Sequence, residues 1–142
     1  MNRVLRPRSR APVYEALTRG VLVRVVASYL PDQSDPIESR WTWGYTIEIE
    51  NHGTETVQLI SRRWLITDGR NHTEEVSGPG VVGEQPRLKP REAFRYASGC
   101  PRGTPSGEMR GTYQMLTDEG EMFEAEIPAF SLHLPNAART MN

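Results

Sequence analysis

The alternation of apolar and polar residues over residues 41–50 constrains this chain more than any other feature. Trp41, Trp43, Tyr45, Ile47 and Ile49 occupy every second position, and mainly threonine and glutamate lie between them. Successive side chains of a β-strand point to opposite faces of the sheet, so this spacing predicts a strand with one buried face. A helix would scatter the same residues around its circumference.

Similar segments recur along the chain, and turn residues such as Asp68-Gly69 separate them. The expected strands are residues 21–29, 41–50, 56–67, 71–76, 94–98, 109–115, 121–127 and 130–134, with Pro128 interrupting the last two. The best helical candidate, residues 13–18, is short and weakly patterned. Seven to eight short strands without helical crossovers predict an all-β fold, an antiparallel β-sandwich. The immunoglobulin or fibronectin type III arrangement is the first choice within that class.

The length of 142 residues fits one domain. We expect the sandwich to occupy residues 15–135, with flexible tails at residues 1–14 and 136–142. Composition argues against several classes of function. The formal net charge is −1, so the basic excess typical of nucleic-acid binders is absent. No apolar run approaches a membrane span, and the single cysteine, Cys100, suits a reducing compartment, so we expect a cytoplasmic protein without nucleic-acid or membrane partners.

Motifs for catalysis and for cofactor or metal binding are missing from the sequence. There is no G-x-S-x-G elbow and no Cys–His signature, and Cys100 is interpreted as an inert thiol. The three histidines, His52, His72 and His133, are not spaced as a metal pair and are expected on the surface. We therefore expect no enzyme activity, no cofactor and no metal site.

Prolines and glycines concentrate between residues 77 and 107, on both sides of the strand expected at residues 94–98, which predicts long irregular loops and the first place to look for a site, above all at residues 77–90. Within it, Gly78, Gly80 and Gly83 match G-x-G-x-x-G. Two following prolines preclude the helix that a dinucleotide-binding unit needs. Two interpretations stay open: a backbone nest that binds an anion, or glycines that permit tight turns while Val81 and Val82 plug the end of the sandwich.

Two adjacent arginines, Arg62 and Arg63, lie inside an expected strand and must point to opposite faces. One of them therefore shares a side with Leu65. A buried arginine would need a carboxylate partner, and an exposed one could serve a ligand. The alternative is a stem that packs on Trp64 with its head in water.

Several segments resemble the ApaG family in their order along the chain. They are residues 61–68 (SRRWLITD), 75–86 (EVSGPGVVGEQP), 94–99 (FRYASG), 104–113 (TPSGEMRGTY), Phe123 and 127–130 (IPAF). The resemblance covers nearly all of residues 21–135 and implies a fibronectin type III-like sandwich. It also implies a link to divalent-cation (Co²⁺ and Mg²⁺) resistance, and protein-binding roles for similar eukaryotic domains. The family often has Arg-His-Trp where this chain has Arg62-Arg63-Trp64, which puts any histidine role at that position in doubt.

The leading hypothesis is a non-enzymatic binding module whose partner is another protein. The alternative is a binder of pyrophosphate or nucleotide, a phosphate-bearing small molecule, through the loop at residues 78–83. The expected site residues are Gly78, Gly80, Val81, Val82, Gly83, Glu84, Arg62 and Arg63.

Overall fold

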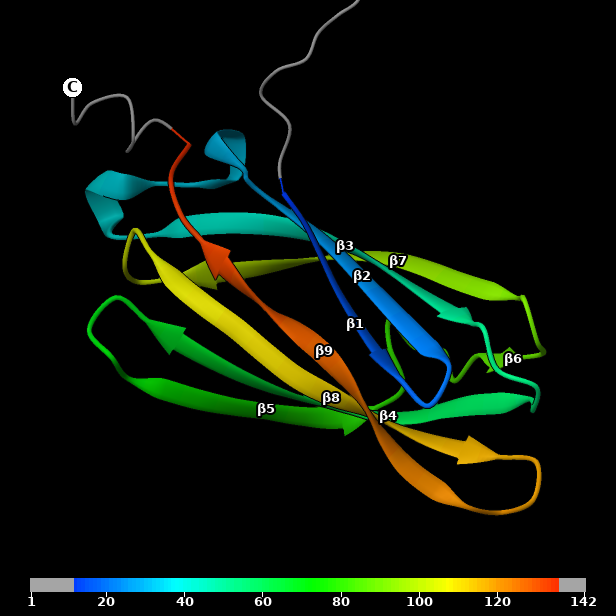
Figure 1. The fold of residues 1–142 in the computed structure, drawn as a ribbon. Coiled ribbons are helices and arrows are strands. Elements are labelled where there is room, and N and C mark those ends of the chain that lie inside the picture. Colours follow the sequence, from blue (N-terminus) through cyan, green and yellow to red (C-terminus); the bar gives the residue numbers. More distant parts are fainter. Residues whose placement is uncertain (1–11, 136–142) are drawn as a thin grey trace, which may run out of the picture.

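The computed structural model describes residues 12–135, and within them the chain forms two antiparallel sheets packed face to face (Figure 1). The strands are β1 (Val13–Thr18), β2 (Val21–Tyr29), β3 (Trp41–Asn51), β4 (Val57–Asp68), β5 (Thr73–Pro79), β6 (Arg87–Leu88), β7 (Ala93–Arg102), β8 (Gly107–Thr117) and β9 (Met122–Leu132). Two single-turn 3₁₀ helices, η2 (Pro31–Gln33) and η3 (Pro36–Glu38), connect β2 to β3.

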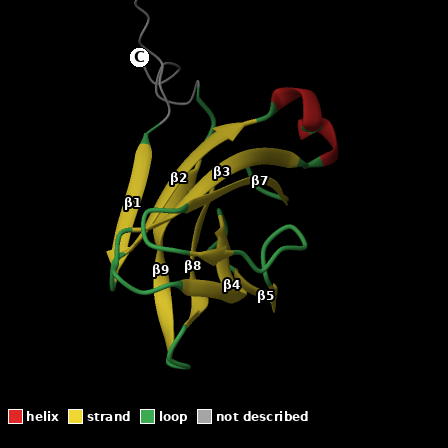
Figure 2. Cartoon of the chain, turned by 90° about the vertical axis from the view of Figure 1, so that its right-hand side faces the viewer, coloured by secondary structure: helices red, strands yellow, loops and turns green. Residues whose placement is uncertain are grey.

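The first sheet has the order β1-β2-β3-β7, and the second has the order β5-β4-β8-β9, with β6 paired to the start of β4. Figure 2 shows the two layers from the end. This arrangement confirms the predicted antiparallel β-sandwich. The finer immunoglobulin or fibronectin type III assignment stays a prediction. Within residues 12–135, no helix has the length and apolar character needed to span a membrane.

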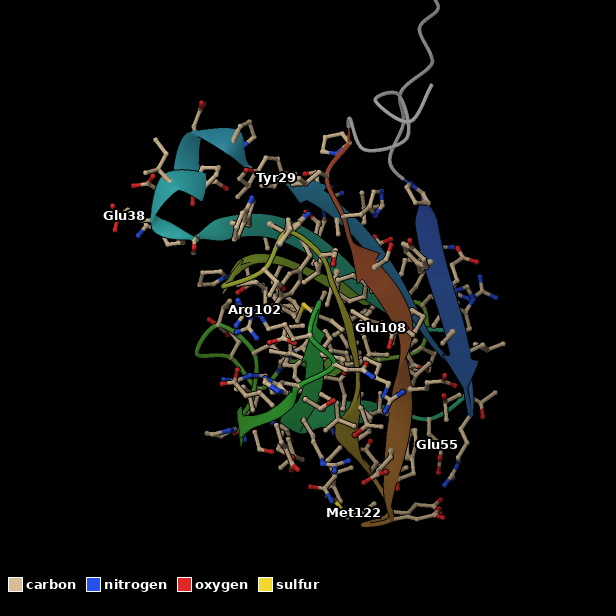
Figure 3. All side chains as sticks on the ribbon, turned by 90° about the vertical axis from the view of Figure 1, so that its left-hand side faces the viewer. Tyr29, Glu38, Glu55, Arg102, Glu108 and Met122 are labelled. Atoms are coloured by element: carbon tan, nitrogen blue, oxygen red, sulfur yellow. The ribbon has the colours of Figure 1, made fainter. Side chains whose placement is uncertain are left out.

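The alternating face of β3 lies at the centre of the core, as the sequence predicted. Trp43, Tyr45, Ile47 and Ile49 are buried between the sheets, where side chains from both layers fill the space (Figure 3). The partners of β3 on either side are β2 and β7. A strand with neighbours on both edges and a packed inner face is held by ladder hydrogen bonds and apolar burial together.

The sandwich is closed along one side, where β1 lies against β9. The Tyr14 hydroxyl is 3.3 Å from Ser131 Oγ, and the backbone N–H of Glu126 donates to Thr18 Oγ1 at 3.0 Å. The segment predicted as the best helical candidate is therefore strand β1. The cause is tertiary: β1 pairs with β2 and packs Tyr14 on the core, which a weak local pattern cannot reveal.

The predicted break at Pro128 is wrong, because β9 runs through it. The register between β8 and β9 shifts where Met109 pairs with Phe130 and Gly111 pairs with Ile127, so Pro128 sits in a bulge. β9 is also an edge strand, and proline is tolerated at edges and bulges because no ladder hydrogen bond from its nitrogen is required. The extra strands β1 and β6, together with this fusion, bring the count within the described residues to nine rather than seven to eight.

Much of the irregular structure predicted within residues 77–107 is strand. β5 extends to Pro79, β6 has 2 residues, and β7 has 10 residues and so is longer than the expected segment 94–98. What remains of the predicted loop is a short connection at residues 80–86 and two tight turns. Glycine and proline at sheet edges were mistaken for loop residues, although edges accept both.

Candidate functional site

The glycine-rich segment runs along the edge of β4 where β5 has ended and β6 has not begun. The backbone N–H of Gly80 donates to the Ile60 carbonyl at 2.9 Å, and that of Leu59 donates to the Pro86 carbonyl at 2.9 Å. Gln85 Nε2 also donates to the Ile60 carbonyl at 2.9 Å. Ile60 is the extra residue of a bulge in β4. The segment is thus fixed to the sheet on both sides of the bulge.

A four-residue turn, the tip turn (residues 81–84), projects from this segment. The backbone groups of Val81 and Glu84 exchange two hydrogen bonds of 2.8 Å each. Both central residues have positive φ, +43° at Val82 and +81° at Gly83. A two-residue hairpin of type I′ requires this combination and usually takes Asn or Gly at both positions. Valine is β-branched and is strained in this conformation.

The two valines of the turn have opposite environments. Val81 is 1% exposed and belongs to the core, which confirms that it plugs the sandwich. Val82 is 57% exposed, so the interpretation that it also fills the core is wrong. Its positive φ turns the side chain away from the sheet edge. The tip turn is therefore anchored by one valine and presents the other to solvent, with Glu84 exposed beside it.

Arg62 holds the base of this turn. Its Nη1 donates to the Pro79 carbonyl at 2.9 Å and to the Gly80 carbonyl at 2.8 Å. Arg62 lies on the inner side of β4 with Trp64, because the bulge at Ile60 changes the phase of the strand. The predicted carboxylate partner is replaced by two backbone carbonyls, which accept the charge-assisted hydrogen bonds instead.

The three glycines of the G-x-G-x-x-G pattern each meet a steric demand of this arrangement. A Cβ at Gly78 would come within 3.1 Å of the Arg62 guanidinium, and a Cβ at Gly80 would lie 2.2 Å from the Glu84 carbonyl oxygen. Gly83 requires positive φ for the turn. The loop turns carbonyls, and not free N–H groups, toward Arg62. This geometry favours the tight-turn interpretation over an anion-binding nest, which needs convergent N–H donors.

Arg63 points to the opposite, outer face of the second sheet. Its Nε and Nη2 donate to Glu75 at 2.9 and 3.3 Å, and this pairing lowers the pKa of the Glu75 carboxyl. Ser77, Gln114 and neighbouring polar side chains line a hollow of about 440 Å³ around Arg63, Arg62 and Gly78. Arg63 is thus paired with Glu75 at the surface, and its role toward a ligand stays a prediction.

A polar contact inside the sandwich escaped the sequence analysis. The hydroxyls of Tyr96 on β7 and Tyr113 on β8 are 2.5 Å apart and join the two sheets. Burial raises the pKa of both phenols, so both stay neutral and can share one hydrogen bond. Both tyrosines lie in strands that the sequence predicted, but no local signal indicates that two hydroxyls meet across the core.

The three histidines lie on the surface, and the single cysteine lies in the core. His52, His72 and His133 are all exposed, as predicted. Cys100 is buried in β7, where burial raises the pKa of its thiol. Within residues 12–135, no group of three or more His, Cys, Asp or Glu is arranged to hold a metal ion.

Comparison with known proteins assigns the chain to a family. The family model described as the ApaG domain matches residues 31–117. The chain belongs to the ApaG domain family. Protein ApaG of Caulobacter vibrioides is 60% identical over 134 residues, covering 94% of this chain and 96% of that protein. Protein ApaG of Brucella anthropi is 57% identical over 130 residues, covering 92% of this chain and 100% of that protein.

Solved structures agree with the ApaG assignment. The crystal structure of the ApaA protein of Bordetella pertussis matches with a TM-score of 0.80 and 44% identity, covering 90% of this chain and 99% of that one. A second X-ray structure matches with a TM-score of 0.79 and 42% identity over 86% of this chain and 92% of that one. The resemblance noted from the residues is thereby confirmed.

Proposed function

We propose that the chain is a non-enzymatic interaction module that binds another protein through the tip turn. One observation carries the proposal: Val82, a β-branched residue at φ +43°, is 57% exposed. Backbone strain of this kind costs about 1–3 kcal/mol and persists where the surroundings enforce it, often at functional sites. Because the side chain faces solvent, packing within the domain does not offset the energy of this strain.

The surroundings of Val82 support a contact role. Val81 anchors the turn in the core, and Arg62 clamps its base, so the exposed valine sits on a rigid protrusion. A pre-formed contact loses little conformational entropy on binding, which favours affinity. Glu84 adds a charge next to the apolar tip. The expected partner therefore offers a small apolar pocket with a basic or hydrogen-bond-donating rim.

Replacing Val82 with glycine should weaken partner capture while raising the free energy of unfolding. Glycine adopts positive φ without strain, so we expect the free energy of unfolding to rise by roughly 1 kcal/mol. The apolar tip is lost, and we expect capture of specific partners to fall at least tenfold. The measurement is quantitative affinity purification of tagged protein, with urea unfolding of the same samples.

Val26→Thr is the matched control, because Val26 is an exposed valine on β2, away from the tip turn. It should leave every partner in place. Partners that are captured equally by wild type and Val82→Gly would contradict the proposal. Loss of capture together with a gain in stability separates a contact role from simple misfolding.

The link to divalent-cation resistance and the cytoplasmic location are likewise proposals, and the first rests on the ApaG resemblance. If the tip turn carries this role, a strain lacking the gene should regain growth on Co²⁺ with wild type and with Val26→Thr, but not with Val82→Gly. Equal growth with wild type, Val26→Thr and Val82→Gly would show that cation resistance does not depend on the tip turn. Growth curves over a series of Co²⁺ concentrations give the measurement.

A further inference from the structure

A second hollow lies at one end of the sandwich and shares no residue with the tip turn. Its volume is about 700 Å³, and it is lined by Glu50, His52, Gly53, Thr54, Pro90 and Arg91. The β3–β4 turn forms one wall, and the connection from β6 to β7 forms the other. In Figure 1 these connections gather at the right-hand end.

Asn51 holds both walls of this hollow in place. It is 1% exposed, and its Nδ2 donates to the Glu55 carbonyl at 2.7 Å and to the Leu88 carbonyl at 3.0 Å. Its Oδ1 accepts from the Gly53 N–H at 2.9 Å, and its backbone carbonyl accepts from the Arg91 N–H at 2.6 Å. A buried amide with this many partners is costly to disturb, so the two walls keep a fixed spacing.

Arg91 is the unusual residue of the hollow. Its φ is +75°, a conformation that favours glycine, and its side chain is exposed. Among residues 12–135 it makes no ion pair, whereas Arg19, Arg24 and Arg63 each do. Arg91 therefore combines a strained backbone conformation with an exposed guanidinium that forms no ion pair among the described residues.

Glu50 and His52, which also line the hollow, are paired with each other, and Glu50 is paired with Arg24 as well. His52 Nε2 is 2.9 Å from Glu50 Oε1, and Arg24 Nη1 donates to the same oxygen at 3.1 Å. These contacts, the one from His52 foremost, lower the pKa of the Glu50 carboxyl. Glu50 is thus an ionised acceptor with the Arg24 guanidinium beside it, and Thr54 adds a hydroxyl to the lining.

We propose that this hollow binds a small organic phosphate that carries hydroxyl groups, with Arg91 as the phosphate ligand. Guanidinium groups bind phosphate oxygens through parallel N–H donors, and Glu50, His52 and Thr54 supply partners for hydroxyls on the same ligand. A volume of about 700 Å³ suits a molecule of sugar-phosphate size. The site is independent of the protein-binding role of the tip turn.

The test follows backbone amide chemical shifts while ribose 5-phosphate is titrated into the full chain. We expect saturable shifts at Gly53, Thr54 and Arg91. Arg91→Gly keeps the fold, because glycine accepts φ +75°, and should weaken binding at least tenfold as read from Gly53 and Thr54. Arg70→Gln is the matched control, since Arg70 is an exposed arginine in the β4–β5 turn at the opposite end of the molecule (Figure 1), and it should titrate like wild type.

Three outcomes would overturn the proposal. One is an Arg91→Gly titration equal to that of wild type. Another is equal binding of ribose, which would show that the phosphate makes no contact. The third is a set of shifts confined to Gly80 and Glu84, which would place phosphate binding at the glycine-rich segment. Because the tip turn is not touched by Arg91→Gly, partner capture by this variant should match wild type and keeps the two proposals separable.

Discussion

Trp43→Ala should lower the free energy of unfolding by about 3–5 kcal/mol. The indole is 1% exposed near the start of β3, and its ring centroid lies 5.5 Å from that of Tyr29. Its Nε1 also donates to the His133 carbonyl at 2.9 Å, which ties the segment after β9 to the first sheet. Alanine removes the packed ring, leaves a cavity and orphans that carbonyl.

Urea unfolding, fitted with a common m-value, measures the loss. Two controls separate its causes. Trp43→Phe keeps most of the ring and loses only the hydrogen bond and some volume, so about 1–2 kcal/mol is expected. Ile37→Ala removes a side chain that is 92% exposed and should change stability by less than about 0.5 kcal/mol. A Trp43→Ala cost near that of Ile37→Ala would mean that the indole does not pack in the core.

Gly80→Ala should be destabilising without any ligand present, by about 2–4 kcal/mol. The new Cβ would lie 2.2 Å from the Glu84 carbonyl oxygen, and φ at this position is +58°. The overlap is with backbone, so it is relieved only by moving Glu84. That movement breaks the hydrogen bond from the Val81 N–H to the Glu84 carbonyl and loosens the tip turn.

Gly83→Ala is the matched substitution. Gly83 also has positive φ, +81°, but a Cβ there meets nothing within 4 Å. It should cost only the backbone strain, about 1 kcal/mol. Thermal unfolding of both variants with and without pyrophosphate completes the experiment. A neutral Gly80→Ala that abolished a pyrophosphate-induced shift would favour the anion-nest interpretation, whereas a ligand-independent loss supports the structural one.

The sequence by itself determined most of the strands and the buried face of β3. Successive side chains of a strand alternate by covalent geometry, so the inward positions of β3 could be assigned from their spacing alone. Turn residues indicated the hairpin at Asp68-Gly69, and the order of motifs along the chain indicated the family resemblance. The sequence also singled out the glycine-rich segment and Arg62 as positions that need an explanation.

Only the tertiary structure decided what those positions do. The bulge at Ile60 reverses the phase of β4 and brings Arg62 to the inner side, where carbonyls about 17 residues away in sequence accept its hydrogen bonds. Val81 and Val82 are adjacent and chemically identical, yet one is core and the other is exposed because of one turn. Likewise, Asn51 brings Arg91 and His52 to one hollow. Such contacts join residues distant in sequence, and no local periodicity encodes their pairing.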